Sequence, residues 1–158
     1  MVTLEIDTSR LNYRIDKFIK QSGISAKTVI KKTGADLLRN ILRPEPYGRH
    51  PVDSGRARAG WYLSMQGLNV RVNLDGGLKS KSQVSQGKSE GRFIDQLKDQ
   101  NFPSITLINS VDYYIYLEWG HSKLSAPYGM VRISVRKMTY RFAKDLRSGI
   151  LSNWKSTP

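Results

Sequence analysis

The sequence predicts an α+β fold with N-terminal helices, a small antiparallel sheet that carries a long loop, and an amphipathic C-terminal helix packed on the sheet. Three observations lead to this fold class. Apolar residues recur every three or four positions over 9–42, polar and apolar residues alternate over 68–74, and a second helical stripe runs through 131–149. At 158 residues the chain can bury one core, so we expect a single domain over 1–158.

The net charge of the chain indicates the class of partner that it would bind. It has 26 Lys and Arg against 13 Asp and Glu, a formal net charge of +13, which favours an acidic or polyanionic partner. The absence of cysteine excludes disulfides and thiolate zinc sites, so a metal site would depend on His50, His121 and carboxylates. The longest apolar run, YYIYL, is too short to cross a bilayer, and the first residues show no secretory signal. We therefore expect a soluble cytoplasmic protein without a membrane partner.

The first expected element is helical and covers residues 9–42. Ser9 can cap it, while Gly23 and Ser25 in the QSGIS segment divide it into two helices or one kinked helix. The apolar residues of the second helix are Val29, Ile30, Leu37, Leu38 and Ile41. The RPEPYG segment at 43–48 ends this helix, because proline lacks an amide donor and disfavours helix in the residue before it.

The next segment, HPVDSGRARAGW at 50–61, predicts a short helix from Ser54 to about Met65. Asp53 can cap this helix by accepting from the amides of its first turn, and Asp53→Ala should then cost about 1 kcal/mol. Arg56 and Arg58 point to roughly opposite sides of the helix, so they do not form one phosphate-facing patch. The face expected to be buried consists of Ala57, Trp61 and Met65.

Two segments have the pattern of β-strands. In LNVRVNL at 68–74, aliphatic residues alternate with Asn and Arg, which is typical of a half-buried strand. SITLINS at 104–110 is expected to be the second strand. Weaker strand candidates lie at 2–6 and around 113–117.

The residues between the two strands are mostly polar. We expect a long mobile loop over 75–91, because Leu78 and Val84 are its only sizeable apolar side chains. A short helix over 92–100 is expected to follow it. The apolar face of that helix would be Phe93, Ile94 and Leu97.

The last expected element is an amphipathic helix. Its apolar stripe is formed by Val131, Val135, Met138, Phe142, Leu146 and Gly149. Its opposite side is formed by Arg132, Arg136, Lys137, Arg141, Lys144 and Arg147. The apolar stripe is expected to face the sheet, whereas the basic side is either an ordinary solvated surface or a contact for phosphate.

Three short motifs suggest catalysis, but each lacks part of the required pattern. Gly87-Lys88-Ser89 resembles the end of a phosphate-binding loop, yet Ser82 replaces the earlier glycine and no apolar strand precedes it. GHSKL at 120–124 lacks the second glycine of a nucleophile elbow. Asp112 and Glu118 are a pair of acids to which nothing assigns acid and base roles. We expect no enzymatic activity, no metal and no cofactor.

The segment VDYYIYLEWGHS at 111–122 combines aromatic residues with an acid. A carboxylate at Glu118, placed among large rings, would need hydrogen-bond partners if it were buried. Gly120 would permit the chain to reverse after it.

These segments, in this order, resemble the tail-completion or neck proteins of long-tailed bacteriophages, a family of head-tail joining and minor tail proteins. In that family a P-V-D-T-G-x-L-R helix start is followed by a strand pair, an aromatic Y-x-x-Y-V-E-x-G run and a P-F pair that opens the terminal helix. The first block is matched by Pro51, Val52, Asp53, Ser54, Gly55 and Arg58. The second block is matched by Tyr113, Tyr116, Leu117, Glu118, Trp119 and Gly120, and the third by Pro127 and Tyr128.

The resemblance also has departures and a plainer interpretation. The family often has Leu-Arg-Pro after the P-F pair, where this chain has Gly129-Met130-Val131. The matched residues can also be interpreted as building the fold alone. In that interpretation Asp53 is a cap, Gly55 and Gly120 serve the backbone, and Trp61 and Trp119 belong to the core.

The resemblance implies a virion structural protein without catalysis, assembled in the host cytoplasm into a ring of six copies in the neck or tail. Its partners would be the capsid connector or adaptor and the tail-tube or tail-terminator proteins, with non-specific contact to DNA in the channel. The candidate contact residues are Lys79, Lys81, Lys88, Arg132, Arg136, Lys137, Arg141 and Lys144. The alternative function is a basic DNA-binding accessory protein, which would bind duplex DNA with strong salt dependence.

Overall fold

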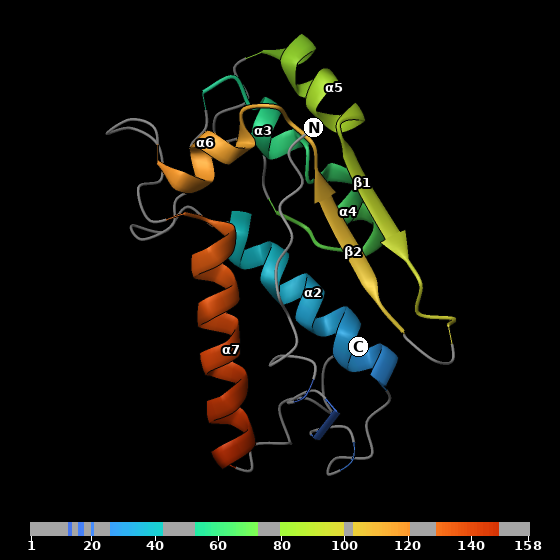
Figure 1. Ribbon diagram of the computed structural model, residues 1–158. Coiled ribbons are helices and arrows are strands. Elements are labelled where there is room, and N and C mark those ends of the chain that lie inside the picture. Colours follow the sequence, from blue (N-terminus) through green and yellow to red (C-terminus); the bar gives the residue numbers. More distant parts are fainter. Residues whose placement is uncertain are drawn as a thin grey trace.

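The computed structural model describes residues 26–42, 53–72, 80–99, 103–120 and 129–148, with positions 13, 16, 17 and 20, and describes the side chains of the last helix as far as Arg141. In chain order the elements are α2 (Ala26–Leu42), α3 (Arg56–Ala59), α4 (Tyr62–Gly67), α5 (Lys81–Ser89), β1 (Gly91–Asp95), β2 (Ile105–Asn109), α6 (Tyr114–Trp119) and α7 (Val131–Ser148). Helices together with a two-stranded antiparallel sheet confirm the predicted α+β class (Figure 1).

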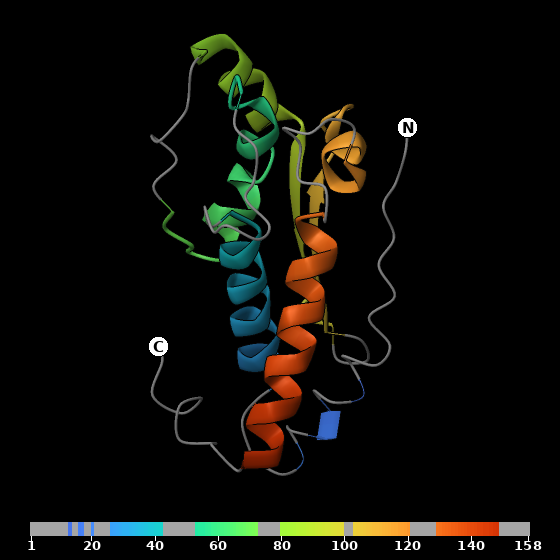
Figure 2. The same ribbon diagram turned by 90° about the vertical axis from the view of Figure 1, so that its left-hand side faces the viewer.

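The two longest helices, α2 and α7, lie side by side, as the two perpendicular views agree (Figure 1, Figure 2). The apolar residues predicted for α2 lie on its buried side, where Val29, Leu38 and Ile41 are almost inaccessible to solvent. Asn40 Nδ2 donates a hydrogen bond to Met138 Sδ at 3.1 Å across the two helices. The predicted C-terminal helix is therefore present, but it packs mainly against α2 rather than on the sheet, and α2 in turn contacts β2.

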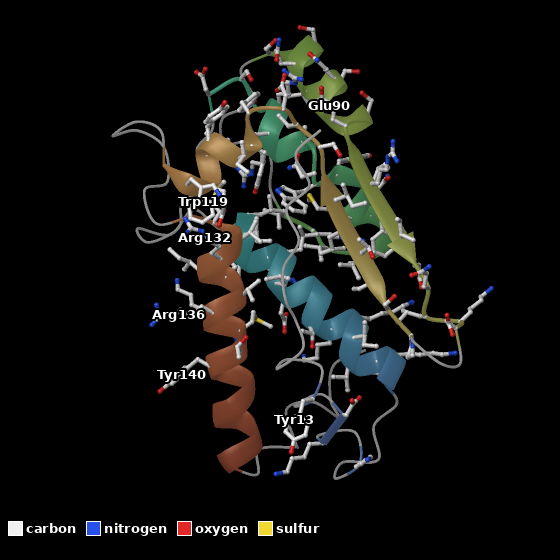
Figure 3. The ribbon with its side chains drawn as sticks, in the orientation of Figure 1. Tyr13, Glu90, Trp119, Arg132, Arg136 and Tyr140 are labelled. Carbon is white, nitrogen blue, oxygen red and sulfur yellow. The ribbon has the colours of Figure 1, made fainter. Side chains whose placement is uncertain are left out.

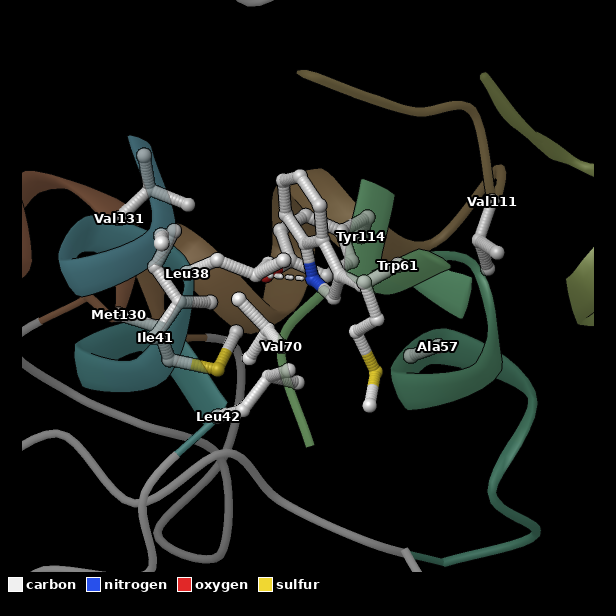
Figure 4. Close-up of a cluster of buried hydrophobic side chains, with 12 residues drawn as sticks. Leu38, Ile41, Leu42, Ala57, Trp61, Val70, Val111, Tyr114, Met130 and Val131 are labelled. Atoms are coloured by element: carbon white, nitrogen blue, oxygen red, sulfur yellow. Dashed lines mark hydrogen bonds between the residues drawn. The ribbon is translucent and has the colours of Figure 1, made fainter. Parts of the chain in front are cut away.

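The core lies where α2, α3, α4, α6 and the start of α7 meet (Figure 4). Its buried members are Ala35, Leu38, Ile41, Leu42, Ala57, Trp61, Met65, Val70, Val111, Tyr114, Met130 and Val131. Ala57, Trp61 and Met65 are all among them, which confirms the buried face predicted for the 54–65 segment.

The helix predicted from Ser54 to Met65 is divided into α3 and α4. The prediction that Asp53 caps it is wrong, because α3 begins at Arg56 and its N-cap is Gly55, which has no side chain to offer. Ser54 Oγ, rather than Asp53, accepts from the amide of Arg56 at 3.4 Å. The backbone of Gly55 has φ 89°, a left-handed conformation that glycine adopts without steric cost.

β1 and β2 form the sheet in antiparallel register, from Gly91 opposite Asn109 to Asp95 opposite Ile105. β2 confirms the strand predicted at 104–110. The short helix predicted over 92–100 is wrong, because pairing with β2 and cover from α4 hold 91–95 as a strand. The strand candidate around 113–117 is also wrong, since those residues belong to the turn before α6 and to α6 itself. The candidate at 2–6 lies outside the described residues.

The strand predicted at 68–74 is not formed over 68–72. The chain instead leaves α4 through Asn69, at φ 51°, and the amide of Val70 donates to Met65 O at 2.8 Å. The alternation still matches burial, because Val70 is buried while Leu68 and Val72 pack against the core. The pattern therefore predicted which side chains face inward, but no described strand pairs with this segment.

The mobile loop predicted over 75–91 is wrong for residues 81–91, which form α5 and the start of β1. Ser80 caps α5, with its Oγ accepting from the amide of Gln83 at 3.5 Å. α5 contacts α3 where Gly87 is buried against the backbone of Arg56, so closely that a Cβ there would overlap the Arg56 carbonyl oxygen. α5 packs against α3 through the close approach at Gly87 rather than through an apolar stripe. The low hydrophobicity of this segment therefore led to the prediction of a loop.

Candidate functional site

The first and second sequence blocks meet where the residues of α3 contact those that open α6. The amide of Ala57 donates to the Tyr113 hydroxyl at 3.1 Å. Trp61 Nε1 donates to the Tyr114 hydroxyl at 3.1 Å, and the two rings meet edge to face with centroids 5.6 Å apart (Figure 4). Burial raises the pKa of the Tyr114 hydroxyl well above its ordinary value. The hydroxyl is therefore held neutral in the folded protein.

Glu118 of the second block caps α7, the helix that follows the third block. Its Oε2 accepts from the amides of Met130 at 2.7 Å and Val131 at 2.9 Å, and its Oε1 accepts from the amide of Arg132 at 2.9 Å. Glu118 is only 1% exposed, so these bonds supply the partners that a buried carboxylate needs. A negative charge at a helix N-terminus also interacts favourably with the helix dipole.

Arg132 completes this junction and lies between Glu118 and Trp119. Its Nε donates to Glu118 Oε1 at 3.2 Å and its Nη2 donates to Glu118 O at 2.8 Å. Its guanidinium carbon lies 3.9 Å from the centre of the Trp119 ring, as a cation–π contact (Figure 3). The placement of Trp119 in the core is wrong, because 58% of this residue is exposed.

The two arginines of the RAR segment do diverge, as predicted. Arg56 forms an ion pair with Glu90, with its Nε 2.9 Å from Glu90 Oε2, and its guanidinium lies over the Tyr113 ring at 5.6 Å. Arg58 is buried on the other side, where its Nη2 donates to Leu42 O at the end of α2 at 3.2 Å. Burial lowers the pKa of the Arg58 guanidinium. Both side chains serve contacts within the fold.

The matched residues divide into three groups by their surroundings. Gly55, Arg58, Tyr113, Leu117, Glu118 and Gly120 belong to the connected junction, as does the core residue Trp61, and Gly120 ends α6 with φ 77°. Asp53, Tyr116 and Trp119 are exposed, and Ser54 is half-buried. Pro51, Val52, Pro127 and Tyr128 lie outside the described residues.

The candidate contact residues do not form one continuous group. Lys81 is exposed on α5, and Lys88 lies over the Tyr62 ring with its Nζ 4.3 Å from the ring centre. Arg132, Arg136, Lys137 and Arg141 are exposed on α7. Lys79 and the side chain of Lys144 lie outside the described residues.

Two contacts that connect elements of the junction could not be predicted from the sequence. Asn109 Nδ2 donates to Ala57 O at 2.8 Å, and its Oδ1 accepts from the amide of Val111 at 3.2 Å, so this residue ties β2 to α3 and α6. Glu90 is the acid that pairs with Arg56. Nothing in the sequence distinguishes Asn109 from other strand residues, whereas Glu90 stands out as the single acid within 80–91.

The described residues do not assemble a recognisable reaction centre. No group of His, Asp or Glu among them could hold a metal ion. Asp112 and Glu118 do not form a pair of acids in one site. Glu118 caps α7, whereas Asp112 lies at the surface beside Arg56. Gly87-Lys88-Ser89 lies within α5 rather than between a strand and a helix. None of the helices in the described part of the chain is long and apolar enough to cross a membrane.

Comparison with protein-family models, with curated proteins and with solved structures finds no significant match for the chain. The candidate site is therefore defined by the contacts in this structure and not by comparison with a known site. It consists of the junction of α3, α6 and α7 and of the exposed surface next to it on α6 and α7.

Proposed function

We propose that the chain is a non-catalytic structural protein of a long-tailed phage neck, which joins the capsid connector to the tail tube as one subunit of a ring. The observation that carries this proposal is the contact between the sequence blocks on which the family resemblance rests. The backbone amide of Ala57, within the first block, donates to the hydroxyl of Tyr113 in the second, and Glu118 of the second caps the helix that follows the third. Residues that matched by chance would not be expected to form one connected junction.

A ring also needs two different complementary faces on each subunit, because a heterologous contact repeats around the axis. Besides Tyr13 and Tyr140, the exposed large apolar residues of the described chain fall into two groups on different elements. Tyr116 and Trp119 lie on α6, whereas Leu63 lies on α4 and Ile94 on β1. In Figure 1 α6 and β1 lie at opposite sides of the molecule. These two groups are the faces that we assign to neighbouring subunits.

The assembly test uses charge placed on one face at a time. Trp119→Glu and the double substitution Leu63→Glu/Ile94→Glu should each prevent ring formation by the purified chain at high concentration, measured by mass photometry. Each variant retains one intact face, so an equal mixture of the two should form dimers and no rings. A wild-type chain that stays monomeric both alone and with connector would contradict the ring.

The functional test is genetic. In the genome that encodes the chain, genes for connector and tail-tube proteins should lie next to its own gene. Disruption of the gene should leave DNA-filled heads and separate tails in infected cells, seen by electron microscopy, and a plasmid copy should restore joined particles. Joined, infectious particles without the gene would overturn the proposal.

A further inference from the structure

The exposed half of α7 carries a concentrated positive charge. Arg132, Arg136, Lys137, Tyr140 and Arg141 are all exposed, and Tyr140 is 75% exposed. Figure 3 shows Arg132, Arg136 and Tyr140 along the side of α7 that faces away from α2. At about 100° per residue, the cations from Arg132 to Arg141 cover about half of the circumference of the helix.

The cations on this surface differ in availability. Arg132 is already neutralised by Glu118 and stacked on Trp119. Further along the helix, Arg136, Lys137 and Arg141 are exposed and form no ion pair with another described side chain. The sequence of α7 contains one acid, Asp145, one turn beyond Arg141. We define Arg136, Lys137, Tyr140 and Arg141 as the α7 basic face.

A second copy of this chain is a poor partner for the α7 basic face, because its described acids lie on separate segments. Asp36 and Glu90 are paired and Glu118 is buried. The exposed acids are Asp16, Asp53, Asp95, Asp99 and Asp112. A polyanion such as DNA offers the complementary charge, with one phosphate charge per ~1.7 Å of duplex.

The arrangement of the cations favours a duplex over a single strand. Arg136 and Arg141 project about 140° apart around the helix axis, with Tyr140 between them. An α-helix fits the major groove, which is bordered by two phosphate strands, so cations on the two flanks of a helix can reach both strands. Arg136 and Arg141 are both exposed, so their guanidinium groups can reach phosphates without leaving the interior of the fold.

We propose that the α7 basic face binds duplex DNA through its phosphates, without sequence specificity. This inference goes beyond the neck function and does not depend on it, because binding is a property of the isolated chain. Its salt dependence follows from counterion release, with log K falling by about 0.9 per phosphate contact for each unit of log salt concentration.

The test compares the full-length wild type with Arg136→Gln/Lys137→Gln/Arg141→Gln. A labelled duplex of mixed sequence is titrated, and fluorescence anisotropy is recorded over a series of salt concentrations. The triple variant should bind at least about tenfold more weakly near 0.1 M salt, with a salt slope smaller by about 2 to 3. The matched control, Lys27→Gln/Lys31→Gln/Lys98→Gln, removes the same charge from exposed positions on α2 and in the turn after β1, and should keep most of the wild-type affinity and slope.

Three results would overturn the proposal. The first is equal loss of binding in the α7 variant and the control, which would assign the affinity to net charge alone. The second is tighter binding of a single strand than of a duplex of the same length. The third is unchanged DNA binding by the α7 variant together with weaker self-association, which would assign the α7 basic face to a protein contact. Circular dichroism melting of each variant verifies that all three proteins are folded.

Discussion

Glu118 determines where α7 begins, because its Oε2 accepts the amide hydrogen of Val131 at 2.9 Å while the carboxylate stays buried. The acid belongs to α6, and the helix that it caps starts thirteen residues later along the chain. The cap therefore couples the direction of α7 to the position of α6. The same junction holds Arg132, in the first turn of α7, over the exposed Trp119 ring.

The first prediction concerns this cap. Glu118→Ala should lower the free energy of unfolding by about 2–4 kcal/mol, because three amides and Arg132 lose a buried charged acceptor. Glu118→Gln keeps one acceptor oxygen and should cost about half as much. Urea unfolding measures both values. Asp36→Ala removes the same charge from a partly exposed ion pair and should cost about 1 kcal/mol or less; equal losses for Asp36→Ala and Glu118→Ala would refute the cap.

The second prediction is a pH dependence that arises from Tyr114. Burial raises the pKa of its hydroxyl above the ordinary value of 10.0, so above pH 10 the unfolded chain loses this proton while the folded protein keeps it. The folded state then binds more protons, and stability falls as pH rises. Tyr114→Phe should be less stable than wild type by about 1–2 kcal/mol at pH 8, since Trp61 Nε1 loses its acceptor.

The measurement is the difference in unfolding free energy between wild type and Tyr114→Phe. This difference should shrink by about 1.4 kcal/mol between pH 9 and pH 11, because only the wild type can lose the Tyr114 proton on unfolding. Titration of all other groups is common to both proteins and cancels. Parallel loss of stability in the two proteins would show that Tyr114 does not contribute.

The third prediction tests the contact of α5 with α3. Gly87→Ala should cost about 2–3 kcal/mol, since the new methyl group would overlap the Arg56 carbonyl oxygen and backbone cannot move aside cheaply. Ser85→Ala, at an exposed position of the same helix, should change stability by less than about 0.5 kcal/mol. Amide hydrogen exchange should also become faster in α5 of the Gly87→Ala protein. Unchanged exchange and stability would mean that α5 does not depend on this close approach.

The elements that could be predicted from the sequence are those with a regular stripe of apolar residues along the face that is buried. The 3.6-residue pattern of Val29, Leu38 and Ile41 was sufficient for α2, and the pattern of Val131 and Met138 was sufficient for α7. The need of Glu118 for partners followed from its chemistry alone. The identity of those partners did not follow, because backbone amides at the start of another helix leave no pattern in the sequence.

The parts that could not be predicted depend on contacts between distant segments. β1 forms because Phe93 and its neighbours pair with β2, although the same residues fit a short helix. Leu68, Val70 and Val72 alternate like a strand but lack a described partner strand. Hydrophobic periodicity reports which side chains are buried, whereas a strand also requires a hydrogen-bonded neighbour.

The last prediction tests whether Asp53 or Gly55 is the residue on which the start of α3 depends. Because Asp53 is exposed and does not cap α3, Asp53→Ala should change the free energy of unfolding by less than about 0.5 kcal/mol. Gly55→Ala should cost about 1–2 kcal/mol, because φ of 89° brings a Cβ too close to the following carbonyl oxygen. Thermal and urea unfolding of the two variants measure these values side by side. A loss of 1 kcal/mol or more in Asp53→Ala, with Gly55→Ala unchanged, would restore Asp53 as the cap and contradict the boundary of α3.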